Sequence, residues 1–260
     1  MIARAIAGIA IATLIAVVAF RARSLSRGGA GAAIVVGSLA VAVSWSWSAL
    51  VIIYFVAAAA VSRAGASVKG RRTLPVVAKS GPRDAAQVVA NGGVFALAAL
   101  GMLVAPAPEW TALAVGSIAA SEADTWGTEI GTWLGADPRS ILTMRPVPPG
   151  TSGGVTIAGT AGTFLGASLI ALSAALLGAP RPICIAAGAG GIGGALVDSL
   201  IGATLQSRRW CDACDAATER VVHDCGQPTR LAGGYRWLDN DAVNLVCGAA
   251  GGLLAVALAG

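Results

Sequence analysis

Residues 183–205, with the sequence ICIAAGAGGIGGALVDSLIGATL, decide the fold class of this protein. The stretch is 23 residues long, and Asp198 is its single charged residue. A transmembrane helix needs about 20 consecutive and mostly apolar residues, so this stretch is predicted to cross a membrane. Its glycine and alanine residues, many of them four apart, are typical of helices that pack closely in lipid.

The composition of the whole chain agrees with this stretch. Of its 260 residues 56% are hydrophobic and only 12% are charged, and the mean hydropathy is +0.75. Soluble domains carry about 25% charged residues. The composition therefore excludes a soluble enzyme, a disordered protein and a nucleic-acid binder of ordinary composition. In a membrane protein, the net charge of +5 describes loops and topology rather than an acidic partner.

Apolar segments recur along the chain and predict an all-α bundle of seven or eight transmembrane spans, forming one integral membrane domain over residues 1–260. The uncertainty in the number comes from the second, third and fifth segments, which are short. The predicted spans are 2–20, 30–43, 47–61, 88–105, 110–123, 155–177, 183–205 and 242–259.

The basic residues support eight spans. With that number, the loops 21–29, 62–87, 124–154 and 206–241 share one side and hold 16 of the 18 Lys and Arg residues. Cytoplasmic loops of membrane proteins are enriched in Lys and Arg. We therefore expect these loops in the cytoplasm, both termini outside, and any chemistry at the cytoplasmic membrane face. The arginines that follow the first segment favour a retained span over a cleaved signal peptide.

Two spans end in acidic residues that are functional candidates. The fifth span ends in Ser121-Glu122-Ala123-Asp124-Thr125-Trp126-Gly127-Thr128-Glu129, and Asp198-Ser199 lies near the end of the seventh. Ionisable groups at membrane depth are costly and often functional. Each span is preceded by one that opens on a glycine pair, which suggests a weak parallel duplication that brings both aspartates to one membrane face.

Carboxylates that converge in this way suit Mg²⁺, which takes one or two carboxylates and completes its shell with phosphate oxygens and water. Asp124, Glu129 and Asp198 are the predicted magnesium ligands and catalytic residues. Glu122 lies seven residues before Glu129 and would share its helix face. The alternative is that the glutamates pair with arginines of the loops and only solvate the end of a helix.

A polar stripe leads into the fourth span. If Pro82 starts the helix, Lys79, Arg83, Gln87 and Asn91 recur every four residues along it. Anchoring by positive charge explains the other basic residues of this loop, but not the uncharged Gln87 and Asn91. These side chains are therefore candidate ligands for a phosphorylated substrate.

A glycine-rich run precedes the sixth span. In Pro148-Pro149-Gly150-Thr151-Ser152-Gly153-Gly154, free backbone N–H groups at a helix start could bind phosphate. A simple turn with a helix cap is the alternative. The GxxxxGK[ST] pattern of the Walker A motif occurs nowhere in the chain.

A cysteine–histidine cluster lies in the last loop, in the spacing Cys211-x2-Cys214-x8-His223-x-Cys225. Four such ligands within a short loop suit a closed tetrahedral zinc site, and the reducing cytoplasm argues against disulfides. We expect structural zinc here; the alternative is four incidental residues with a redox-sensitive cysteine pair. Asp239, Asn240 and Asp241 follow, and either cap the last helix or join the site.

Several of these motifs together resemble one integral-membrane family. They are the 121–131 segment, Gly150-Thr151-Ser152-Gly153-Gly154-Val155-Thr156, the segment from Asp198 to Gln206, and Trp237-Leu238-Asp239-Asn240-Asp241. The family includes phytyl-phosphate kinase and transmembrane protein 19, and the resemblance covers nearly the whole chain. Ser152 departs from the pattern, in which asparagine is expected.

The resemblance implies a kinase that converts prenyl or phytyl monophosphate to the diphosphate, with CTP or another nucleoside triphosphate and Mg²⁺. The expected partners are therefore a prenyl phosphate, a nucleotide and membrane lipids, without nucleic acid. The candidate substrate- and nucleotide-binding residues are Lys79, Arg83, Gln87, Asn91, Glu122, Thr125, Thr128, Thr151, Ser152, Gly153, Gly154, Ser199, Asp239, Asn240 and Asp241.

Two other functions stay open at this point. A cytidylyltransferase would form a CDP-lipid and release pyrophosphate, using similar acidic residues. A lipid or ion transporter would need acidic residues near the middle of the membrane, whereas the predicted span boundaries place Asp124, Glu129 and Asp198 at span ends.

Overall fold

The computed structural model describes residues 2–73, 76–79, 81–135 and 137–260. Over these residues it contains eight long helices, one for each predicted apolar segment, and the short helix α4. The all-α membrane bundle is thus confirmed. The helices are α1 (Ile2–Arg21), α2 (Arg27–Val43), α3 (Trp45–Arg63), α4 (Ala66–Thr73), α5 (Ala85–Val104), α6 (Pro108–Leu134), α7 (Ile157–Leu176), α8 (Arg181–Thr204) and α9 (Asn240–Ala259).

Length and composition divide the long helices into two groups. Helices α3, α5, α7, α8 and α9 are each long and apolar enough to cross a membrane. The apolar parts of α1 and α2 are shorter, and α6, the longest at 27 residues, contains four acidic residues. The fold is therefore a multi-span bundle, in which α6 carries Glu122 into the buried interior, whereas Glu109 is exposed.

Helix α6 differs most from its predicted boundary. The sequence placed its end near Ala123, but the helix continues to Leu134. Asp124 and Glu129 therefore lie inside a helix and not in the loop after it. The apolar stretch ends near residue 123, but the following turns of the helix contact α4 through the Lys69–Glu129 ion pair and a hydrogen bond from Arg72 to Thr132 O. Hydropathy does not register such contacts.

The start of α5 also corrects a prediction. The helix begins at Ala85, after Asp84, and Pro82 lies in the preceding segment rather than in the first turn. Asp84 Oδ1 accepts the backbone N–H of Gln87 at 2.9 Å, and Gln87 Oε1 accepts that of Asp84 at 3.0 Å. This reciprocal capping box stabilises the first turn, so Lys79 and Arg83 precede the helix.

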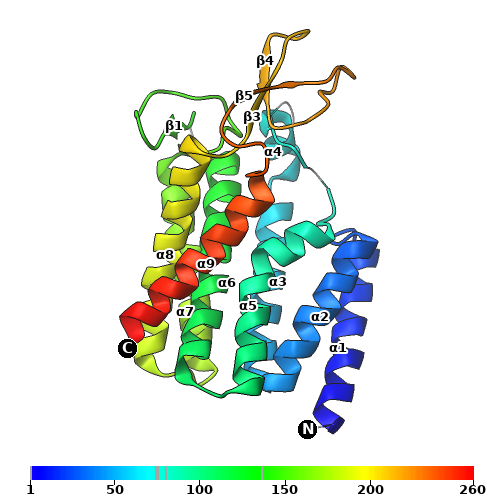
Figure 1. Cartoon of the computed structure of the whole chain (residues 1–260), viewed down its shortest axis with the longest axis vertical. Helices are drawn as coiled ribbons and strands as arrows, with labels where there is room; N and C mark the ends of the chain where they lie inside the picture. Colours follow the sequence, from blue (N-terminus) through cyan, green and yellow to red (C-terminus); the bar gives the residue numbers. More distant parts are fainter. Residues whose placement is uncertain (1, 74–75, 80, 136) are drawn as a thin grey trace.

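All the strands and α4 gather at one end of the bundle (Figure 1). Strands β3 (Arg208–Cys211), β4 (Ala216–Thr218) and β5 (Arg230–Gly233) form an antiparallel sheet in the order β4-β3-β5. The short strands β1 (Arg139–Ser140) and β2 (Gly154–Val155) pair antiparallel. The four loops that the distribution of basic residues assigned to one side thus meet at this end, which we call the loop end.

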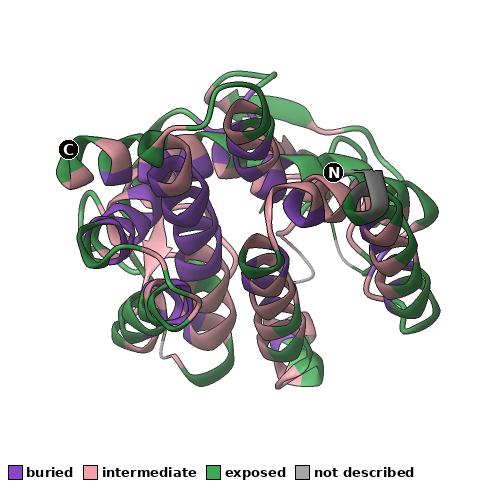
Figure 2. Ribbon diagram, turned by 90° about the horizontal axis from the view of Figure 1, so that it is seen from below, coloured by how far each residue is buried: buried purple, intermediate pink, exposed green. Residues whose placement is uncertain are grey.

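Helices α6, α7, α8 and α9 form the tightly packed part of the bundle, and their facing sides are buried (Figure 2). Close approach depends on glycine. A Cβ atom on Gly194 of α8 would lie 2.6 Å from Ala120 Cβ of α6, and one on Gly251 of α9 would lie 2.5 Å from the same atom. These distances are too short for real carbon atoms, so the helices meet here only because side chains are absent.

The outer surface carries many exposed large apolar side chains, among them Leu14 of α1, Leu172 of α7 and Ile185 of α8. Lipid tails solvate such side chains, while the backbone polar groups stay bonded inside the helices. Helices α1 and α2 pair with each other at one edge and join the bundle through the contact of α2 with α5.

The glycine contacts give a prediction for stability. Gly251→Ala should lower the stability of the folded protein by about 1–3 kcal/mol, because the added methyl group overpacks the contact with Ala120. Gly31→Ala is the matched control, since Gly31 lies in α2 with no atom within 4 Å of the added carbon. Thermal unfolding in detergent measures both; equal melting temperatures for the two variants would contradict the packing argument.

Candidate functional site

A cavity of about 890 Å³ lies at the loop end, where residues from six of the long helices meet the loops. Every side chain proposed above from the sequence as a substrate, nucleotide or magnesium ligand lines it, with the exception of Glu122. Segments more than 150 residues apart along the chain, such as those of Lys79 and Asp241, are in direct contact in this cavity. The fold therefore brings the predicted residues into one place.

Asp124 of α6 and Asp198 of α8 reach the cavity because of the glycine contact beneath them. The two helices run in the same direction, toward the loop end (Figure 1). Gly194 touches Ala120, and residues four positions further lie one turn along the same helix faces. Those residues are Asp198 and Asp124, so one interhelical contact sets the height of both carboxylates.

Asp198 has the less satisfied carboxylate of the two. Its Oδ2 atom is buried and has no hydrogen-bond partner among the described residues. The negative charges of Asp124 and Glu219 both act on it. A buried carboxylate oxygen without a donor is costly, and a bound cation would remove that cost.

Glu129 lies in a different setting. Its carboxylate forms an ion pair with Lys69 of α4, whose side chain is only 8% exposed. The Lys69 ammonium also donates to the backbone oxygens of Val61 and Ser62, each at 2.8 Å. Glu129 thus ties α6 to α4 and the end of α3, and its charge is already balanced. The alternative paired this glutamate with an arginine of a loop; its partner is instead Lys69 of α4.

Glu122 is fully buried and does not line the cavity. Its Oε1 accepts a hydrogen bond from the Trp126 indole N–H one turn further along α6. The spacing of seven predicted that Glu122 shares a face with Glu129. The cavity face of α6 instead includes Asp124, Thr125 and Thr128, so the prediction that Glu122 binds substrate is not supported by its position.

The polar stripe lines the cavity even though only half of it is helical. Lys79 bridges Asp84 Oδ2 at 2.8 Å and Asp241 Oδ2 at 2.5 Å. The hydrogen bond from Lys79, followed by that of the Gln87 backbone, lowers the pKa of Asp84. Gln87 and Asn91 follow on the first turns of α5.

Arg83 is held by its backbone, which exchanges hydrogen bonds with the Ser24–Ser26 segment between α1 and α2. Its positive charge acts on the Tyr54 hydroxyl of α3. Asp239 is the N-cap of α9, where its Oδ1 accepts the Ala242 N–H at 3.0 Å. Asp239, Asn240 and Asp241 thus do both things that the sequence suggested: one caps the helix and all three line the cavity.

The glycine-rich run lies before the start of a helix rather than at it, so phosphate binding by its backbone stays a prediction. Helix α7 begins at Ile157, capped by Thr156, whose hydroxyl accepts the Gly159 N–H at 2.9 Å. Before it, the backbone N–H groups of Thr151 and Gly154 bond within the loop, at 3.1 and 3.0 Å. The run is a compact turn that presses on α8, and spacing alone could not separate these two arrangements.

Gly153 makes that close approach possible. Its φ of +76° suits glycine, and a Cβ atom there would lie 2.5 Å from Ala203 Cβ of α8. The adjacent Ser152 hydroxyl points to Glu219 and donates a hydrogen bond to it. An asparagine side chain, which the family resemblance led us to expect, could donate to the same carboxylate.

Glu219 and Lys69 are cavity residues that the sequence reasoning missed. Glu219 follows β4 and accepts hydrogen bonds at Oε1 from Ser152 Oγ and from Gln206 Nε2, the latter at 2.9 Å. Burial raises its pKa, against the lowering effect of the Ser152 hydrogen bond. No sequence motif marks Glu219. It lies between the two halves of the cysteine–histidine cluster, which drew attention to the cysteines and the histidine instead.

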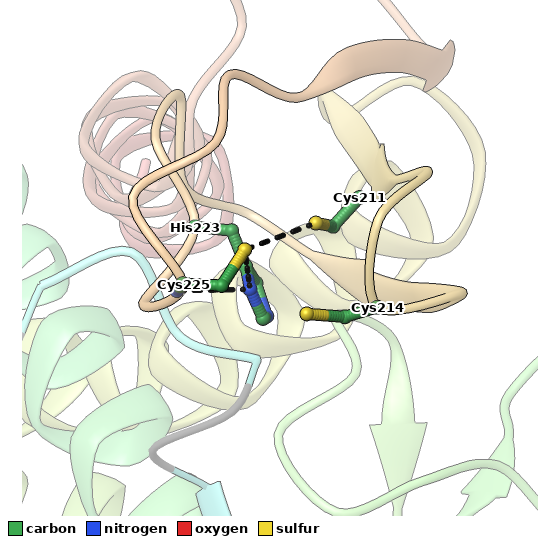
Figure 3. A group of neighbouring side chains, drawn as sticks. All are labelled: Cys211, Cys214, His223 and Cys225. Atoms are coloured by element: carbon green, nitrogen blue, oxygen red, sulfur yellow. Dashed lines mark hydrogen bonds between the residues drawn. The ribbon is translucent and has the colours of Figure 1, made fainter.

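The cysteine–histidine cluster forms as predicted (Figure 3). One ligand atom from each of Cys211, Cys214, His223 and Cys225 lies within 4.8 Å of all the others. The Cys211 and Cys225 sulfurs are 3.6 Å apart, and Cys225 Sγ is 3.3 Å from His223 Nδ1. Sulfur ligands of tetrahedral zinc lie about 3.8 Å apart, as bonds of about 2.3 Å require. The donor set and spacing therefore fit zinc.

These features define a multi-pass helical membrane protein with a polar cavity at one end and a cysteine–histidine cluster in the loop beside it. The chain belongs to the family described as integral membrane protein DUF92, which matches residues 10–252. This agrees with the family resemblance of its sequence motifs.

Individual relatives cover different shares of the chain. Protein PGR of Arabidopsis thaliana is 27% identical over 94% of this chain and 92% of its own length. An uncharacterized membrane protein of Methanocaldococcus jannaschii is 35% identical over 60% of this chain and 63% of its own. An uncharacterized membrane protein of Synechocystis is 33% identical over 43% of this chain and 44% of its own length. No solved structure matches the chain.

We propose that the cluster holds one structural zinc ion. Elemental analysis of protein purified without added metal should find about one zinc per chain, and replacing both Cys211 and Cys214 by serine should remove it. Cys184→Ser is the matched control, because Cys184 is a buried residue of α8 outside the cluster. Metal-free protein with an intact loop and full activity would rule out structural zinc.

Proposed function

We propose that this protein is a prenyl-phosphate kinase, which transfers a phosphoryl group from CTP or another nucleoside triphosphate to a prenyl or phytyl monophosphate. The observation that carries the proposal is the cavity. It combines carboxylates from two neighbouring helices with basic side chains and with an apolar wall inside the bundle. Such a site suits a lipid phosphate that meets a water-soluble nucleotide.

The apolar wall supports a lipid substrate. Phe55 of α3, Phe164 of α7 and Leu196 of α8 line the cavity. Phe164 is 52% and Leu196 50% exposed, so this wall leaves apolar surface free for a substrate. A prenyl chain could therefore pack against it while the phosphate occupies the polar end.

The polar end supports phosphoryl transfer. Asp124 and Asp198 would hold Mg²⁺, which neutralises the triphosphate charge. Glu129 is less suited to this role than the sequence suggested, because Lys69 already balances its charge. Lys79 and Arg83 would bind phosphate oxygens, as Lys and Arg do in other phosphate sites.

The reaction needs little more from the chain than positioning. An oxygen of the prenyl monophosphate attacks the γ-phosphorus, the bond to the β,γ-bridging oxygen breaks, and the nucleoside diphosphate leaves. The attacking oxygen belongs to a phosphate monoester, which is largely ionised near neutral pH. A general base is therefore hardly required, and the cavity lining contains no histidine among the described residues.

Two alternative functions can be separated from the kinase by what the protein releases or moves. A cytidylyltransferase would use the same acidic residues but attack the α-phosphorus and release pyrophosphate. A transporter gains some support from α6, because Asp124 lies about 15 Å before the end of that helix rather than at it. Release of CDP supports the kinase, release of pyrophosphate the transferase, and substrate movement without turnover the transporter.

Turnover of a prenyl monophosphate with CTP, while Mg²⁺ is titrated, tests the mechanism. Asp124→Asn and Asp198→Asn keep the size of the side chain but remove its charge, and each should lower the rate by at least about 10²-fold. Glu109→Gln is the matched control, since Glu109 is exposed at the opposite end of α6. If both asparagine variants keep the wild-type rate and Mg²⁺ dependence, these residues do not form the site.

We further propose that the loop end faces the cytoplasm in the inner membrane, as the positive-inside distribution favours. A cysteine introduced at Arg71, exposed in α4, should react with an impermeant maleimide only after cells are permeabilised. A cysteine at Arg181, exposed at the opposite end, should react in intact cells. Labelling of the Arg71 variant in intact cells would reverse the topology.

A further inference from the structure

Glu219 enters the cavity from an element that has no other role in the proposed chemistry. It follows β4, the second strand of a hairpin whose first strand ends at Cys211. Cys211 and Cys214 precede Glu219 in the sequence, and His223 and Cys225 follow it. The cysteine–histidine cluster therefore brings together the two ends of the segment that contains Glu219. The loop above the membrane therefore presents one carboxylate to the cavity below.

The position of Glu219 is fixed by several contacts. Its backbone N–H donates to Val76 O at 2.8 Å, and the side chain of the adjacent Arg220 donates to Val77 O at 2.9 Å. Its carboxylate accepts hydrogen bonds from Ser152 and Gln206, both at Oε1. These donors are all uncharged, so they orient the carboxylate without balancing its charge.

The other acidic groups of the cavity differ in this respect. Glu129 pairs with Lys69, and Asp241 pairs with Lys79 through Oδ2, while its Oδ1 is buried with no hydrogen-bond partner among the described residues. Asp198 has a buried oxygen with no partner among the described residues, and it lies within the electrostatic influence of both Asp124 and Glu219. A carboxylate can accept about four hydrogen bonds, so Glu219 has capacity left for a cation.

We propose that Glu219 is a third carboxylate ligand, with Asp124 and Asp198, of the divalent cation in this cavity. The proposal rests on the proposed function for the presence of that cation, and it adds a ligand from the cysteine–histidine loop. Oxygen-only coordination suits Mg²⁺ and Mn²⁺. The acidic cluster alone would not indicate a ligand, but the buried Asp198 oxygen, which has no hydrogen-bond partner among the described residues, does.

Binding of Mn²⁺ alone to the purified full-length protein tests this ligand, with free Mn²⁺ followed by electron paramagnetic resonance. The wild type should bind Mn²⁺ saturably, and Asp198→Asn should lose the site. Glu219→Gln keeps a hydrogen-bond acceptor but removes the charge, and should weaken Mn²⁺ binding by about tenfold or more. Glu109→Gln, far from the cavity, should bind as the wild type does.

Glu219→Asp provides a second test, because it keeps the charge but withdraws the carboxylate by one methylene group, and it should also weaken Mn²⁺ binding. Wild-type affinity in either Glu219 variant, or no saturable Mn²⁺ binding by the wild type, would overturn the assignment. The measurement uses no substrate, so it is independent of the kinase proposal. Protein that loses Mn²⁺ through Glu219→Gln but converts no prenyl phosphate would refute the kinase and keep the ligand.

Discussion

The contact between Gly194 of α8 and Ala120 of α6 is the constraint on which the rest of the site depends. It allows the two helices to approach until a β-carbon would not fit between them. Close packing is the main attractive force between helices in lipid, because burial of apolar surface gains little there. The same contact sets the relative height of the helices, and Asp124 and Asp198 follow one turn later on the same faces.

A second constraint is the cost of charge inside a membrane. Polar side chains on a bundle of this kind must either pair with one another or face a hydrated cavity. Both solutions occur side by side at the loop end. Lys69 and Glu129 pair and tie α4 to α6, whereas Asp198 Oδ2 and Asp241 Oδ1 are buried with no hydrogen-bond partner among the described residues. The paired groups support the architecture, and the unpartnered oxygens mark where a ligand would be stabilised.

The cysteine–histidine loop connects the surface of the molecule to this cavity. Its cluster has the ligand types and spacing of a closed zinc site, and structural zinc sites stabilise small loops that lack a hydrophobic core. The hairpin it closes ends at Glu219, which Ser152 and Gln206 hold against the cavity. Folding of this loop and completion of the cavity are therefore physically linked.

The sequence by itself determined the features that depend on local composition and spacing. The lengths of the apolar segments predicted all eight long helices, and the distribution of basic residues assigned the four loops to one end. The spacing of the residues from Cys211 to Cys225 predicted the cluster. All but one of the substrate, nucleotide and magnesium ligands proposed from the sequence line the cavity. They could be recognised because acidic and polar residues are rare in apolar segments. These signals are readable along the chain because each comes from residues close together in it.

Only the tertiary structure decided which of those candidates are already paired, which are buried in the core and which are left to face the cavity. Glu129 pairs with a lysine 60 positions away, Glu122 faces the packed core, and the glycine-rich run bonds to itself. Glu219, with no motif of its own, enters the cavity because Ser152, 67 positions away, holds it there. Charge balance and burial depend on contacts between distant segments, and linear spacing carries no information about such contacts.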